Sequence, residues 1–118
     1  MSTLNGRGII DVEHHTASDT LTTAENGTLH TNVGATGTIT LTLPAATLGL
    51  NFRFYVGAAY ELRIDPNGTE LMSLPATGVP GAAGKYLVAD LAGESLHLVC
   101  AVAGQWAVYG TVGTWTSE

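Results

Sequence analysis

The feature that most constrains the fold is an alternation of apolar and polar residues with a period of two. In residues 38–43, Ile39, Leu41 and Leu43 alternate with threonines. Successive side chains of a β-strand point to opposite faces, so this pattern predicts a strand with one buried face. Similar patterns, rich in β-branched and aromatic residues, predict further strands. They cover residues 9–13, 28–33, 52–56, 60–65, 70–74, 86–90, 95–102 and 106–109.

Turn residues separate these segments at regular intervals. Asn26-Gly27 and Asn67-Gly68 are pairs that tolerate the positive φ of tight turns. Helix is confined to one possible turn at residues 45–48 after Pro44, and residues 75–84 are expected to form a loop. Short strands at spacings of about 8–12 residues predict an all-β fold. We expect a compact antiparallel sandwich, jelly roll or barrel of about eight to ten short strands.

The alternation also predicts which side chains face inward. In the stronger strands these are Ile39, Leu41, Leu43, Phe52, Phe54, Val56, Tyr60, Leu62, Ile64, Trp106 and Val108. The chain has 118 residues, of which 17 are Thr, 15 Ala and 15 Gly, so large apolar side chains are few. This length fits one domain. Its core should be thin, or completed by another chain.

Residues 1–24 differ from residues 25–118, which we expect to form a single β domain. The N-terminal segment is polar apart from Ile9, Ile10 and Val12. It is interpreted either as an extended arm ordered by a partner or as the first strand of the domain. As an arm, its three apolar residues could add a strand to a neighbour's sheet. They are therefore candidate partner-binding residues.

The charge distribution excludes several classes of partner. The net charge is −6, and Arg7, Arg53, Arg63 and Lys85 are the only cations. Nucleic acids and anionic membranes are bound through clusters of cations, so neither is expected as a partner. No apolar run approaches the roughly 20 residues of a spanning helix, and no secretory signal is expected at the N-terminus.

Catalytic and metal-binding motifs are weak. Asp11, Glu13 and His15 would share one face of an extended segment, His14 would lie on the other, and His30 is distant in sequence. A solvated polar strand is the expected reading, and no metal or cofactor is predicted. No serine lies in a nucleophile elbow, so no enzyme activity is expected.

The sequence also predicts the positions of two individual residues. Cys100, within an apolar run, is expected in the core. Trp115 is expected either to cover the core or to contact another subunit, and in the second case it is a further candidate partner-binding residue.

The order of several segments resembles β-rich virion proteins of tailed bacteriophages. The resemblance spans residues 20–115. It is carried by Thr-Leu-Pro-Ala-Ala at 42–46, Leu-Arg-Ile-Asp-Pro at 62–66, Gly-Gln-Trp at 104–106 and Gly-Thr-Trp at 113–115. Small head decoration (cement) proteins and modules of tail fibres and other appendages share such segments. The resemblance implies no catalytic residues.

What the resemblance implies is a structural function. The chain is expected to be a capsid decoration protein that binds the major capsid protein as a homotrimer and stabilises the mature shell. It would be synthesised in the host cytoplasm and reside on the capsid surface of the virion. The alternative is a tail-fibre, baseplate or appendage domain that binds a host glycan or protein.

Overall fold

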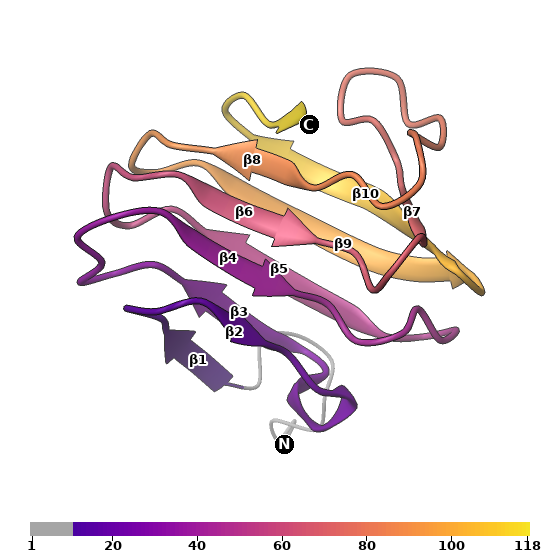
Figure 1. Cartoon of the computed structure of the whole chain (residues 1–118), viewed down its shortest axis with the longest axis horizontal. Coiled ribbons are helices and arrows are strands. Elements are labelled where there is room, and N and C mark those ends of the chain that lie inside the picture. Colours follow the sequence, from indigo (N-terminus) through magenta and orange to yellow (C-terminus); the bar gives the residue numbers. More distant parts are fainter. Residues whose placement is uncertain (1–10) are drawn as a thin grey trace, which may run out of the picture.

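The computed structural model describes residues 11–118, which form a sandwich of two β-sheets (Figure 1). The first sheet has six strands in the order β1 (Asp11–His14), β3 (Thr28–Thr31), β5 (Asn51–Tyr55), β9 (Ser95–Val102), β10 (Gln105–Val112) and β7 (Leu71–Met72). The second has five, in the order β11 (Thr116–Ser117), β8 (Leu87–Ala89), β6 (Leu62–Asp65), β4 (Ile39–Thr42) and β2 (Asp19–Thr20). The prediction of an all-β sandwich of short strands is confirmed.

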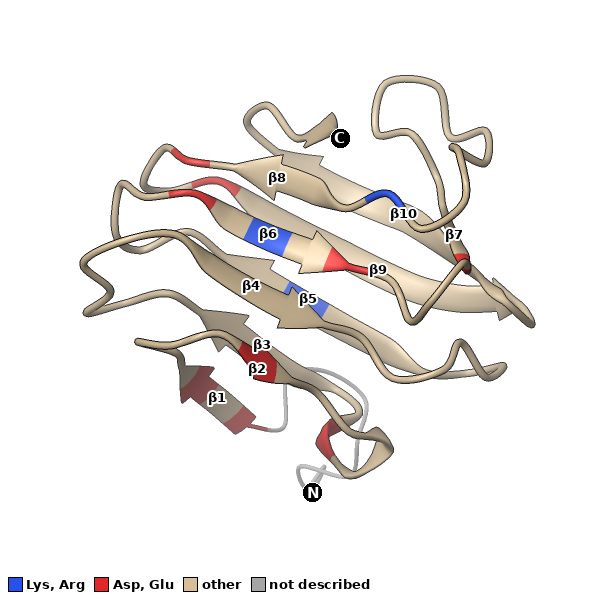
Figure 2. Ribbon diagram, in the orientation of Figure 1, with Lys and Arg blue, Asp and Glu red and all other residues tan. Residues whose placement is uncertain are grey.

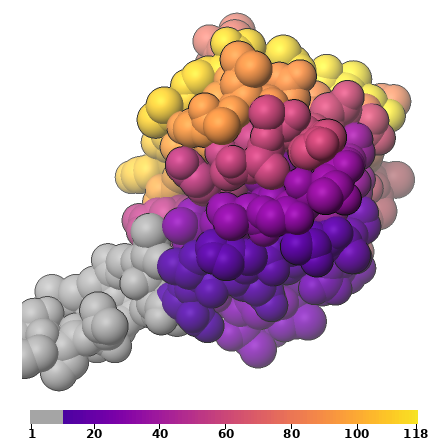
Figure 3. Space-filling model, turned by 90° about the vertical axis from the view of Figure 1, so that its left-hand side faces the viewer, coloured from indigo at the N-terminus to yellow at the C-terminus, as the bar shows by residue number. Residues whose placement is uncertain are grey.

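The first six strands wind alternately between the two sheets. Odd-numbered strands enter the six-stranded sheet and even-numbered strands the five-stranded sheet, so β1–β3–β5 and β2–β4–β6 each pair in parallel. In the side view, the segments follow one another in sequence order from the bottom of the molecule to its top (Figure 3). The expected antiparallel arrangement is wrong for this half. Two parallel neighbours in a sheet must be joined by a crossover connection, whereas antiparallel neighbours can be joined by a hairpin. Here each crossover contains one strand of the opposite sheet.

Most of the later strands pair antiparallel, and β7 is the exception because it pairs in parallel with β10. β9 pairs with both β5 and β10, while β8 pairs with β6 and β11. The β9–β10 register shifts between Val108 and Gly110, which marks Tyr109 as a bulge residue. A bulge turns its side chain out of the regular alternation. Tyr109 is accordingly 75% exposed.

The core lies between the two sheets and follows the predicted alternation. Phe52, Phe54 and Trp106 are fully buried, and the Phe52 and Trp106 rings lie 5.7 Å apart. Of the residues predicted to face inward, Tyr60 is an exception because it precedes β6 and is 44% exposed. Cys100 is buried as expected, and burial raises the pKa of its thiol. A buried neutral thiol is chemically inert.

The single helical turn is not where the sequence placed it. Residues 45–48 contain no helix, and a 3₁₀ turn, η1, forms at Thr23–Glu25. The Glu25 Oε1 atom accepts a hydrogen bond from the Thr22 amide at 2.8 Å. A threonine followed three residues later by glutamate is a known signature of a helix start, and it was available in the sequence.

Asn32 fastens one turn of the winding to the next. Its side chain is fully buried and its Oδ1 accepts hydrogen bonds from the amides of Gly57 and Ala58, at 2.8 and 3.0 Å. Its Nδ2 donates to the carbonyls of Ala58 and Tyr60. All the hydrogen-bonding capacity of the amide oxygen and nitrogen is therefore used within the fold.

Replacing Asn32 with alanine is expected to lower the free energy of unfolding by about 2 kcal/mol, because four part-buried hydrogen bonds to the backbone of Gly57, Ala58 and Tyr60 are lost. Urea unfolding at fixed protein concentration would measure the change. Asn67→Ala, at an exposed turn position, is the control and should change stability by less than about 0.5 kcal/mol. Equal effects of the two substitutions would contradict this role for Asn32.

Residues 11–24 belong to the edges of the sandwich. β1 and β2 are edge strands, one of each sheet. An arm over residues 1–10, including Ile9 and Ile10, lies outside the described residues. Within residues 11–118, no helix has the length and apolar character required to cross a bilayer.

Candidate functional site

The outer face of the six-stranded sheet combines apolar and aromatic side chains. The strand registers place Val12, Leu29, Arg53 and His97 in one row across β1, β3, β5 and β9. Along each strand these residues alternate with residues that face the other sheet, so this row faces outward. Val12, Tyr55, Tyr109 and Val112 are exposed by 49, 39, 75 and 60% respectively. This outer face is the candidate interaction surface.

A hollow of about 460 Å³ lies on this outer face. It is open to solvent and lined by Leu29, Arg53, Tyr55, Ser95, His97 and Val112, among others. Gly110 contributes to it because no atom approaches the position where a Cβ would lie. The Tyr109 ring packs edge-on against His97, with the ring centroids 5.8 Å apart. Burial and the nearby Arg53 lower the pKa of His97, so its ring is neutral at pH 7.

The carboxylates are segregated away from this outer face. β1 and β2 at the N-terminal edge carry acidic residues, and others lie along the five-stranded sheet (Figure 2). On β6, Arg63 pairs with Glu61 at 2.8 Å. On the strands of the six-stranded sheet the only acidic residues are Asp11 and Glu13, and both lie in the inward rows, paired with Thr28 and His30. The outer face therefore presents Arg53 without a neighbouring carboxylate of its own strands.

The predicted partner-binding residues differ in their exposure to solvent. Val12 is exposed on the edge strand β1, where it is accessible to a partner. Trp115 is only 5% exposed and belongs to the core cluster, so the alternative in which it covers the core is the one observed. The prediction of Trp115 as a partner contact is therefore corrected, because a buried ring offers almost no surface to a partner. Ile9 and Ile10 lie outside the described residues.

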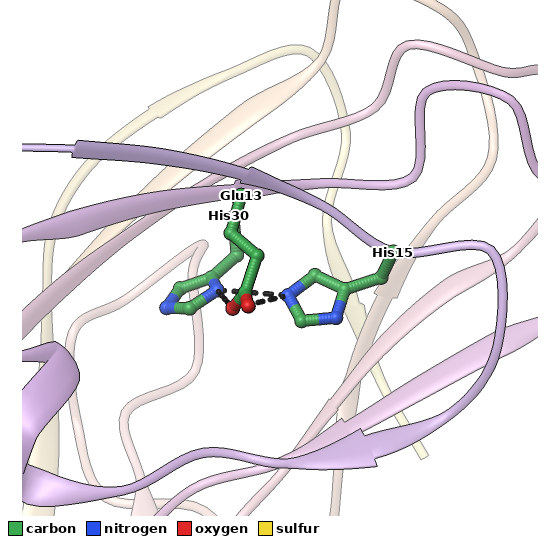
Figure 4. A group of neighbouring side chains, drawn as sticks. All are labelled: Glu13, His15 and His30. Carbon is green, nitrogen blue, oxygen red and sulfur yellow. Dashed lines mark hydrogen bonds and ion pairs between the residues drawn. The ribbon is translucent and has the colours of Figure 1, made fainter.

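A second candidate site lies at the N-terminal edge, where three side chains converge (Figure 4). The Oε1 atom of Glu13 lies 3.2 Å from His15 Nε2 and 3.3 Å from His30 Nδ1. The two imidazole nitrogens are 2.9 Å apart. Both histidines are buried, whereas the Glu13 side chain is 45% exposed. The cluster thus opens to solvent on the side of its carboxylate.

Parallel pairing of β1 with β3 creates this cluster, because it aligns Glu13 with His30. His15 follows β1 on the same face, while His14 points to the other face and bonds Thr31 Oγ1 at 2.6 Å. The prediction that Glu13 and His15 share a face separate from His14 is confirmed. The expected solvated strand is wrong for His15, which is buried. His30, expected to be distant, joins the cluster because strand register places it beside Glu13, and register between separate segments is not readable from spacing.

The electrostatics of the cluster favour neutral imidazoles. Burial lowers the pKa of His30 to about 4 and also lowers that of His15. A hydrogen bond that the protonated Glu13 donates to the neighbouring Glu25 carboxylate, together with burial, raises the pKa of Glu13 to about 7. Burial opposes ionisation of Glu25, but its bonds to Glu13 and Thr22 outweigh burial and lower its pKa. Two carboxyl groups and two unprotonated imidazoles are thus held side by side near neutral pH.

Comparison with protein-family models gives no match for this chain, and comparison with curated proteins gives none either. The two candidate sites are defined by the geometry of residues 11–118. One is an extended surface suited to a macromolecule, and the other is a compact group of donor atoms suited to an ion or a proton.

Proposed function

We propose that this chain is a structural protein of a tailed-bacteriophage virion, a decoration protein that binds the outer surface of the head as a homotrimer and stabilises the mature shell. The observation that carries the proposal is the outer face of the six-stranded sheet, which combines apolar and aromatic side chains with Arg53 and bears no carboxylate of its own strands. The resemblance over residues 20–115 provides the virion context.

The charge distribution supports self-association through this outer face. A molecule with a net charge of −6 repels its own copies wherever acidic surfaces meet. The outer face of the six-stranded sheet avoids that repulsion, and Tyr55, Tyr109 and Val112 offer apolar area for burial. Aromatic residues are enriched in the centres of protein interfaces.

A threefold ring requires two different surfaces on each subunit, because its contacts are heterologous. The outer face with Arg53 is one surface. The acidic edge with Asp11 and Asp19 is a complementary one on the next copy. Such pairing places opposite charges across each contact, and it closes a ring of three where threefold rotation relates successive copies.

Stabilisation of the shell follows from mass action. A protein that binds only the mature shell lowers the free energy of that state by about 2.7 kcal/mol per site at a concentration 100-fold above Kd. Many sites on one head add their contributions. The N-terminal segment would supply a further contact, in which Ile9, Ile10 and Val12 add a strand to a sheet of the major capsid protein.

The first test is the native mass of the purified chain, measured by light scattering over a wide dilution range. A mass near three chains is expected for the wild type. Tyr109→Glu places a charge on the outer face at a position that is already exposed, and should shift the mass towards one chain. Leu91→Glu is the matched control, because Leu91 is 62% exposed and lies outside that face, and it should leave the mass unchanged.

The second test is binding to heads assembled without the chain from the major capsid protein encoded in the same genome. The wild type is expected to bind and to raise the temperature at which the heads disrupt, whereas a chain lacking residues 1–10 should bind more weakly. Unchanged binding of the truncated chain would refute the role of the N-terminal segment. Absence of binding by the wild type would refute the decoration function.

The alternative is an appendage domain that binds a host glycan or protein. Tyr55 and Tyr109, exposed on the outer face, are suited to stacking against sugar rings. A monomeric chain that binds host glycans and not heads, with binding lost in Tyr109→Ala, would favour this alternative.

A further inference from the structure

We propose that Glu13, His15 and His30 form a binding site for a divalent transition-metal ion, of which Zn²⁺ is the best match. The three donor atoms, Glu13 Oε1, His15 Nε2 and His30 Nδ1, all lie within 4.8 Å of one another (Figure 4). They come from the edge strand β1, the residue that follows it, and β3.

The separations of the donor atoms match the coordination sphere of such an ion. With bonds of about 2.1 Å to each donor, separations of 2.9–3.3 Å correspond to angles of about 90–105° at the metal. These angles lie between octahedral and tetrahedral values. An ion at that distance would sit about 1 Å out of the plane of the three atoms, so no large rearrangement is needed.

The chemistry of the donors selects the class of metal. Two imidazoles and one carboxylate suit zinc and neighbouring first-row ions, whereas Mg²⁺ and Ca²⁺ prefer shells of oxygen atoms. Three protein ligands leave at least one position for water or a partner's side chain. The Glu25 carboxyl beside Glu13 adds negative charge that a cation would neutralise.

The surroundings of the histidines favour binding. His30 is fully buried, its ring lies 5.8 Å from those of Phe52 and Phe54, and its position is therefore fixed. The Nδ1 atom of His15 lies 3.9 Å from Asp19 Oδ2. The two atoms are too far apart for a hydrogen bond, and the Asp19 carboxylate adds negative charge beside His15. The Glu13 side chain is 45% exposed, although its Oε1 atom is buried.

The consequence of binding would be a clamp on the N-terminal edge of the sandwich. The ion would join β1 to β3 and to the segment that leads into β2. Metal bound only to the folded state raises its stability by mass action. This site is separate from the outer face and does not depend on the proposed virion function.

The test is calorimetric titration of ZnCl₂ into the full chain, prepared without a histidine tag and treated with chelator. One ion per chain with a Kd of about 10 μM or tighter is expected, and MgCl₂ should give no comparable binding. Zinc at about 100-fold above Kd should raise the Tm by on the order of 10 °C. The absorption spectrum of the Co²⁺-loaded chain would report imidazole ligation and coordination number.

Glu13→Gln removes one ligand at a partly exposed position and should weaken zinc binding by at least about tenfold. His14→Gln, which removes a histidine from the opposite face of the same strand, is the matched control and should bind as the wild type does. A wild-type Kd of about 1 mM or weaker, or equal binding of Mg²⁺, would overturn the proposal. Equal affinities of Glu13→Gln and the wild type, or a loss confined to His14→Gln, would also overturn it.

Discussion

Replacement of Trp106 by alanine is expected to lower the free energy of unfolding by about 3–5 kcal/mol, the largest effect of any single substitution considered. Trp106 is the largest of the fully buried side chains and packs against Phe52 between the two sheets. The core contains few large apolar side chains, so few neighbours can relax into the cavity left by the indole ring. Chemical denaturation at fixed protein concentration would measure the change.

Two further variants separate packing from polar effects. Trp106→Phe should destabilise by less than about 2 kcal/mol, because the buried Trp106 Nε1 has no hydrogen-bond partner among the described residues and its removal relieves an unmet polar group. Tyr60→Ala removes an exposed aromatic ring and should change stability by about 0.5 kcal/mol or less. A Trp106→Ala effect as small as that of Tyr60→Ala would contradict the assigned core.

Loss of the Glu94 carboxylate is expected to have the second largest effect, about 3–4 kcal/mol in Glu94→Ala. Glu94 is buried, and its Oε1 accepts hydrogen bonds from the amides of Asp90 and Leu91, at 3.2 and 2.8 Å. Its Oε2 accepts a bond of 2.7 Å from the amide of Thr114. The carboxylate thus joins the turn after β8 to the segment that precedes β11, and its loss leaves three backbone amides without this partner.

Acidity provides an independent measure of this interaction. Burial alone would raise the pKa of Glu94, but the three amide bonds outweigh burial and lower it. A lowered folded pKa means that the stabilisation is present above the unfolded value near 4.5 and is lost as the pH falls through the folded pKa. Unfolding measured at pH 7 and pH 3 should therefore show a smaller acid-induced loss in Glu94→Gln than in the wild type. An equal loss in both would contradict the role of the ionised carboxylate.

The same contact explains a glycine in the closing Gly-Thr-Trp segment. Gly113 has a φ of 79°, and a Cβ there would lie 2.4 Å from the Glu94 side chain. Thr114 donates to Glu94, and Trp115 covers the core. Each residue of the segment thus makes a different contribution to the fold.

The class of fold and most of the strands could be predicted from the order of residues alone. Alternation identified the buried faces of β4 and β5, because side-chain direction along a strand depends only on position along the chain. It also separated His14 from Glu13 and His15 for the same reason. The prediction for Tyr60 is wrong because it extends the alternation two residues before the start of β6.

The pairing of the strands and its direction could not be predicted in this way. Parallel winding of β1 to β6 depends on the strands crossing between two sheets, which no local pattern of residues records. That pairing placed Glu13 beside His30, and it placed Val12, Leu29, Arg53 and His97 in one outward row. Both candidate sites depend on register between distant segments. Register is set by the packing of whole sheets, and therefore the sites became visible only in the folded chain.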